Sequence, residues 1–120
     1  MSQDRFADWL RDMHAAALQA CSYVEGMERT EFLADAKTQD AVTMKVLVIG
    51  ELAAKLLAND PERCDRANHI PWTDMKGMRN RIAHGYFEID AGVVWTTVQR
   101  ALPDLIGQLA ALLASGQHNR

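Results

Sequence analysis

Apolar residues recur at every third or fourth position along most of this chain, and this spacing limits the fold more than any other feature. On an α-helix such residues share one face, which can be buried against a neighbouring element. The pattern predicts long helices at about residues 3–25, 38–58 and 71–84, and a last helix that follows Asp90 and gives way to a frayed tail at Ser115. The predicted fold class is all-α, an up-and-down bundle of four to five helices. The second helix is apolar around most of its circumference, as in helices that lie centrally or at a subunit contact.

Turn and cap residues mark the ends of the first two helices. Gly26 is expected to end the first helix, because glycine adopts the left-handed conformation common at that place. Thr30 is expected to cap a short helical turn at residues 31–34. Residues 59–68 are polar and predict a connector, and Pro71 can occupy the first turn of the third helix because its missing N–H is not needed there.

The later helix ends carry similar signals. Gly85 is expected to terminate the third helix, and Asp90 to cap the last one. Pro103 lies inside the pattern of the last helix, where it removes a backbone hydrogen bond and collides with the preceding turn. We therefore expect a kink at residues 99–102.

Size and charge narrow the class of protein. The 120 residues, 48% of them hydrophobic, suit one domain, residues 1–120, with one core. The formal net charge of −3 argues against a surface that binds nucleic acid everywhere, so any such contact should be local, for example at Lys76, Arg79 and Arg81. The apolar runs are too short to span a membrane, no signal peptide is evident, and two cysteines make no disulfide framework. These features predict a soluble cytoplasmic protein.

The segment at residues 78–86 concentrates the chemically useful side chains. Asn80 and His84 lie one turn apart on nearly the same helical face, and Arg79 and Tyr86 also nearly align. Arg79 and His84 are five residues apart, which separates them by about 140° on an ideal helix. Three arrangements could still bring both to one target. The helix could loosen at Gly85, the long Arg79 side chain could wrap around, or a second copy of the segment could complete the site.

These residue types suit RNA cleavage. Arginine presents a planar fork of donors that matches a phosphate, and histidine can take and return a proton near neutral pH. Together they suit attack of a ribose hydroxyl on the neighbouring phosphodiester without a metal or another cofactor. The alternative is structural, with His84 as a helix cap and Arg79 as an ion-pair partner of Glu51 or Asp74. Asn80 and Tyr86 favour the functional interpretation.

The segment resembles the signature of HEPN domains, an Arg followed by a polar residue and then a His, at Arg79, Asn80 and His84. The ending His84-Gly85-Tyr86 is similar to that of HepT-like toxins, a branch of this superfamily. The other segments that resemble the family, in the family's order, are Lys37-Thr38-Gln39-Asp40-Ala41-Val42, Ile49-Gly50-Glu51, Ile70-Pro71-Trp72, Gly77-Met78-Arg79-Asn80, Val94-Trp95 and Leu102-Pro103.

The resemblance implies a homodimeric HEPN-like bundle with metal-independent ribonuclease activity on an RNA such as tRNA or mRNA. His84 would act as general acid or base, Arg79 would contact the scissile phosphate, and Asn80 would position the substrate or the His. The resemblance also implies a toxin–antitoxin pair, in which a minimal nucleotidyltransferase antitoxin adds AMP to Tyr86. Glu51 could orient Arg79 or His84 across the bundle, or form only a structural ion pair.

Two other functions remain open on the sequence alone. The chain could be a non-catalytic helical module that binds a nucleotide or a partner and is modified by the nucleotidyltransferase, or a purely structural dimer. His14, His69 and His118 show no ligand spacing with each other or with cysteine, so the sequence predicts no metal site. We expect Trp9, Trp72 and Trp95 to anchor the core or an interface, and Cys21 to behave as a small buried hydrophobe.

Overall fold

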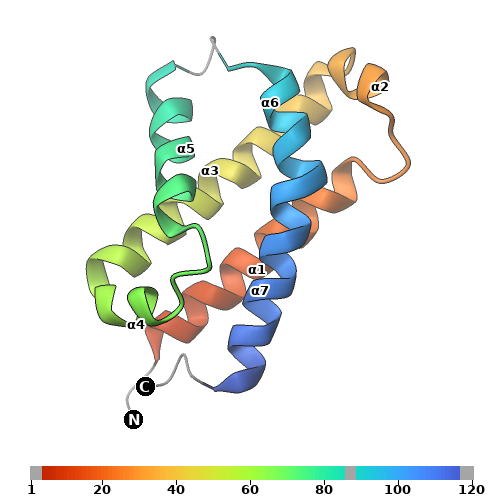
Figure 1. Ribbon diagram of the computed structural model, residues 1–120. Helices are drawn as coiled ribbons and strands as arrows, with labels where there is room; N and C mark the ends of the chain where they lie inside the picture. Colours follow the sequence, from red (N-terminus) through yellow and green to blue (C-terminus); the bar gives the residue numbers. More distant parts are fainter. Residues whose placement is uncertain (1–3, 86–88, 117–120) are drawn as a thin grey trace.

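The computed structural model describes residues 4–85 and 89–116, and within these ranges the chain forms helices and no strand (Figure 1). The all-α class predicted from the sequence is therefore confirmed. The elements in chain order are α1 (Arg5–Tyr23), α2 (Arg29–Leu33), α3 (Ala36–Asn59), α4 (Pro61–Arg66), α5 (Trp72–Gly85), α6 (Ala91–Thr96), the π-helical turn η2 (Thr97–Ala101) and α7 (Leu102–Ser115).

α3 is the central helix of the bundle. It packs against α1 on one side and α5 on another, while α7 packs against α1 (Figure 1). Its stripe of buried residues was predicted from their helical spacing, and the fully buried members include Val42, Ile49 and Leu56. Because α5 is held mainly by α3, the position of α5 depends on this one helix–helix contact.

Several predicted helix ends are confirmed. Gly26 has the expected left-handed conformation, with a φ of 79°, although α1 ends earlier than predicted, at Tyr23 with Val24 as its C-cap. The Asp90 carboxylate accepts a hydrogen bond from the Gly92 N–H at 2.7 Å and caps α6. A kink was predicted at residues 99–102, and the structure has there the π-helical turn η2 (Thr97–Ala101), before a proline that has no N–H to donate.

Other details of the prediction were wrong. Thr30 lies inside α2 and does not cap it, because the Glu31 side chain instead accepts from the Glu28 N–H at 2.8 Å, one half of a capping box. The connector at 59–68 contains α4, which begins at Pro61 and is capped by the Asp60 carboxylate. Ser115 is still helical. Residues 117–120 of the predicted frayed tail lie outside the described ranges.

The described helices include none that is long and apolar enough to cross a bilayer. Trp72 is buried, as predicted, and the rings of Trp95 and Phe32 lie 5.3 Å apart between centroids. Cys21 is only partly buried, with its Sγ 3.8 Å from the Val98 carbonyl oxygen.

Candidate active site

The site is built on α5, and a glycine of α3 fixes where α5 lies. A Cβ added to Gly50 would stand 2.3 Å from the Arg79 Cβ and 2.7 Å from the Met75 carbonyl oxygen, closer than such atoms ever approach. Only glycine at position 50 therefore lets the two helices come this close. The backbone of Arg79 rests directly on α3 as a result.

Arg79 points toward α3. Its Nη1 donates to Glu51 Oε1 at 3.0 Å, and its Nε is buried without a hydrogen-bond partner among the described residues. A buried donor without a partner costs about 1–3 kcal/mol, so the guanidinium is not fully satisfied in this position. A quarter of the Arg79 side chain is exposed, which leaves it accessible to an anion.

Asn80 follows Arg79 on the solvent-exposed side of α5. Its side chain makes no hydrogen bond to other residues in the two described ranges. The amide is therefore available to a ligand, although Asn80 is not among the described residues that line the His84 pocket.

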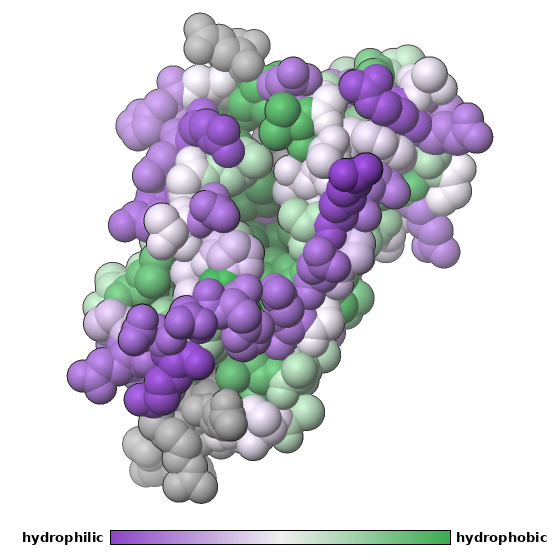
Figure 2. All heavy atoms as spheres, in the orientation of Figure 1, coloured by the Kyte–Doolittle hydropathy of each residue, from purple (hydrophilic) through white to green (hydrophobic). Residues whose placement is uncertain are grey.

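His84 is exposed in the last turn of α5 and lines a pocket of about 420 Å³ between α5 and α6. The pocket is also lined by Met78, Arg81, Ile82, Gly85, Ile89, Asp90 and Val93. Figure 2 shows this face, where hydrophobic side chains lie in the hollow between α5 and α6 and hydrophilic ones border it. The imidazole therefore stands at the edge of a partly apolar hollow.

Arg79 and His84 face different neighbours in the part of the chain that the structure describes. Arg79 is paired with α3, whereas His84 lines the pocket toward α6, and Arg79 is not among the residues that line it. α5 stays helical through Gly85, so no loosening before that residue turns one group toward the other. Tyr86, the predicted modification site, lies outside the described residues.

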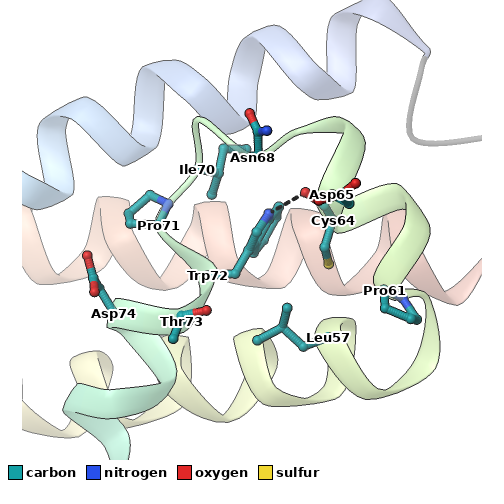
Figure 3. Close-up of a pocket in the computed structure, with 10 residues that line it drawn as sticks. All are labelled: Leu57, Pro61, Cys64, Asp65, Asn68, Ile70, Pro71, Trp72, Thr73 and Asp74. Carbon is teal, nitrogen blue, oxygen red and sulfur yellow. Dashed lines mark hydrogen bonds between the residues drawn. The ribbon is translucent and has the colours of Figure 1, made fainter.

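A second pocket lies at the other end of α5 and holds a structural cluster (Figure 3). The Trp72 indole N–H donates to the carbonyl oxygens of Cys64 at 3.1 Å and Ala67 at 3.2 Å. Burial raises the pKa of the Cys64 thiol to about 11, which keeps it protonated and unreactive. This cluster joins α4 to the start of α5 and contains none of the predicted site residues.

Comparison with known proteins decides the family. The model of the family described as "Ribonuclease HepT-like" matches residues 13–112, which include all of α3 and α5. The chain belongs to the HepT-like ribonuclease family. The resemblance seen in the sequence is thus confirmed. No solved structure matched the chain.

Several relatives of this HepT-like chain are similar over most of their length. A Thermococcus cleftensis protein named as a probable ribonuclease HepT is 36% identical over 105 residues, which are 88% of this chain and 93% of that protein. A Methanocaldococcus jannaschii protein is 33% identical over 91 residues, 76% of this chain and 73% of its own. A Caldanaerobacter subterraneus protein is 27% identical over 100 residues, 80% of this chain and 87% of its own. The names of the last two give RNase as a provisional activity.

Two features of this HepT-like site were missed in the sequence. Gly50 was seen only as part of a family segment, although a lone glycine inside an apolar helix is a signal of close backbone approach. The arginines Arg29 and Arg100, which line a neighbouring pocket, gave no signal because they are distant in the sequence from residues 78–86.

Proposed function

We propose that this HepT-like chain is the toxin of a toxin–antitoxin pair and cleaves RNA, without a metal, in a site shared by two copies. The observation that supports the proposal is that Arg79 and His84 leave α5 toward different neighbours, Arg79 toward Glu51 on α3 and His84 toward the pocket beside α6. A two-fold dimer can bring the Arg79 of one copy to the His84 of the other. Met44 on α3 is 56% exposed, and such apolar surface is consistent with a contact between copies.

The proposed reaction is an internal transfer of the phosphodiester. The ribose 2′-oxygen attacks phosphorus as its proton passes to a His84 imidazole acting as general base. The bond from phosphorus to the 5′-oxygen breaks, and that oxygen takes up the proton from the same His84, now an imidazolium. The products are a 2′,3′-cyclic phosphate and a 5′-hydroxyl, so no water, metal or oxidant is consumed.

The other proposed roles follow from position. Arg79 neutralises the phosphate oxygens as charge develops on them, and Glu51 holds its guanidinium against α3 before the phosphate binds. The exposed Asn80 amide orients the ribose or the imidazole. A phosphate that draws Arg79 outward would also relieve the unsatisfied Nε donor.

The test is cleavage of RNA by the purified chain in EDTA, with the ends of the products analysed. We expect cyclic-phosphate ends, and no product with Arg79→Ala or His84→Ala. Cleavage that persists in His84→Ala would refute the role of His84, and cleavage that requires an added metal would refute the mechanism.

We further propose that a minimal nucleotidyltransferase is the antitoxin and adds AMP to Tyr86. A bulky anionic group beside His84 would exclude RNA phosphate by charge and volume. Intact mass after co-expression should show added AMP in the wild type and none in Tyr86→Phe. A chain that accepts AMP and never cleaves RNA would instead be the non-catalytic module that the sequence left open.

A further inference from the structure

A third pocket, distinct from the one drawn in Figure 3, adjoins the pocket that His84 lines. It has a volume of about 490 Å³, and its lining residues are Arg29, Asp90, Gly92, Val93, Thr96, Thr97, Arg100 and Ala101. Asp90 and Val93 line both pockets, so the two adjoin at the start of α6. The two pockets together, named here the α6 groove, have His84 in the lining of one and Arg29 and Arg100 in the lining of the other.

The charge of the α6 groove is positive although the whole chain is acidic. Arg29, Arg81 and Arg100 line it, and none of them has an ion-pair partner in the part of the chain that the structure describes. Arg11, Arg63 and Arg79, by contrast, are each paired with a carboxylate. The whole chain has a formal net charge of −3, so most of its surface should not attract RNA. Three arginines without an ion-pair partner within the described ranges, all in one groove, form a local site for phosphate.

The polar groups other than the arginines and His84 are already engaged. Asp90 is the acid that lines the groove, and its carboxylate accepts from the Gly92 N–H at 2.7 Å. The Thr96 and Thr97 hydroxyls donate to the carbonyl oxygens of Gly92 at 3.1 Å and Val93 at 2.8 Å. The donors left for a ligand are therefore those of the arginines and of the His84 imidazole.

The shape of the groove separates an apolar part from a cationic part. Beside His84 the walls are Met78, Ile82, Ile89 and Val93, and the volume lies in the range of about 300–1,000 Å³ common for small-ligand sites. Farther along, Arg29 reaches from α2 so closely that a Cβ on Gly92 would stand 3.0 Å from its Nη2. An apolar hollow followed by cations matches the flat base and the following phosphate of a single-stranded nucleotide.

We propose that the α6 groove binds single-stranded RNA beside the scissile phosphate, with an unstacked base in the apolar part and the next phosphates on Arg29 and Arg100. The inference rests on the proposed function, because it extends the same site. It selects unpaired segments of RNA as substrates, since a base inside a helix cannot enter the hollow.

Binding to a catalytically blocked chain tests the groove separately from cleavage. Full-length His84→Ala would be titrated with a short fluorescein-labelled single-stranded RNA over a series of salt concentrations. Each phosphate contact to a single strand contributes about 0.7 to the slope of log K against log salt. Arg29→Ala combined with Arg100→Ala should therefore lower that slope by about 1.4, whereas Arg11→Ala, a change in the exposed pair with Asp8, should leave it unchanged.

Substitutions at Val93, which is 45% exposed, distinguish RNA from a protein occupant. Val93→Glu should weaken RNA binding, because a carboxylate repels phosphate. Val93→Lys adds a side chain of similar length with a positive charge, so it should maintain or strengthen RNA binding. If a second copy of the chain occupied the groove, both would weaken association of the copies, as measured by sedimentation. Equal loss of RNA binding in both variants, an unchanged salt slope, or no RNA binding by His84→Ala would each overturn the inference. If wild type cleaved no RNA while the salt slope still changed as expected, the proposed function would fail and the groove would stand.

Discussion

Gly50 and Arg79 lie in direct contact across α3 and α5, where a Cβ on Gly50 would be 2.3 Å from the Arg79 Cβ. The next residue along α3, Glu51, accepts a hydrogen bond from the Arg79 guanidinium. Two successive residues of the central helix thus fix the backbone and the side chain of the phosphate-binding candidate. The first prediction concerns the glycine.

Gly50→Ala should lower the free energy of unfolding by about 1–3 kcal/mol, because the added methyl group forces α5 away from α3. The displacement also moves Arg79, so RNA cleavage per folded molecule should fall. Chemical denaturation and initial cleavage rates measure the two effects. Gly107→Ala in α7 is the control, because a Cβ there meets nothing within 4 Å. It should stabilise the protein by about 0.5–1 kcal/mol and leave cleavage unchanged. Equal behaviour of the two variants would contradict the role of Gly50.

Glu51→Ala should reduce cleavage roughly ten- to a hundredfold through kcat, with little change in KM, because it releases Arg79 without removing it. Stability should change by about 1 kcal/mol or less, since half of the Glu51 side chain is exposed. Glu51→Gln, which can still accept from Arg79, should recover part of the rate. Asp74→Asn serves as the control, because Asp74 is the other acid considered for Arg79 and makes no ion pair in the described part of the chain. A loss that appears only in KM would argue that Glu51 affects binding of RNA and not the position of Arg79.

Trp72→Phe should lower the free energy of unfolding by about 1–3 kcal/mol, through the lost hydrogen bonds to Cys64 and Ala67 and the space left by the smaller ring. Cleavage by the folded fraction should persist, because the pocket drawn in Figure 3 is lined by none of the candidate site residues. Trp95→Phe should cost less, since Trp95 is only partly buried. A greater loss in Trp95→Phe would contradict this account of Trp72.

Acid should destabilise the fold through two helix-capping carboxylates. Hydrogen bonds from Thr38 lower the pKa of Asp35, and the Arg63 guanidinium lowers that of Asp60, both from the ordinary value of 3.8. Their contribution is present above the unfolded pKa and is lost as the pH falls through the lower folded pKa. Denaturant midpoints measured from about pH 5 to about pH 3 should therefore drop less steeply in Asp35→Asn and Asp60→Asn than in wild type. Asp12→Asn, an exposed residue, should retain the wild-type slope.

The sequence predicted the helices because each one carries its own apolar stripe, and local spacing reveals it. Caps such as Asp90 were predicted for the same reason, since the carboxylate and the N–H that it accepts from are neighbours in the chain. The cap of α2 was misassigned because Thr30 and Glu28 both lie near its start, and spacing alone did not decide between them.

Contacts between distant segments could not be predicted in the same way. Sequence spacing gave the 140° divergence of Arg79 and His84 but not the direction of either, which depends on the packing of α5 on α3. The α6 groove joins residues from α2, α5, α6 and η2, so no single stretch of sequence contains its pattern. Of the expected site, only the pairing of Arg79 with Glu51 was foreseen as a contact, and as one of two alternatives.

The most direct test of the shared site is complementation between two inactive chains. Arg79→Ala and His84→Ala chains would be mixed, unfolded and refolded together, and assayed on RNA in EDTA. Random pairing places half of the chains in mixed dimers, each with one site that has both an intact Arg79 and an intact His84, so activity should return to about one quarter of wild type. Each variant alone should remain inactive. A mixture as inactive as its components would contradict the shared site, because it would mean that each copy needs its own Arg79 and its own His84.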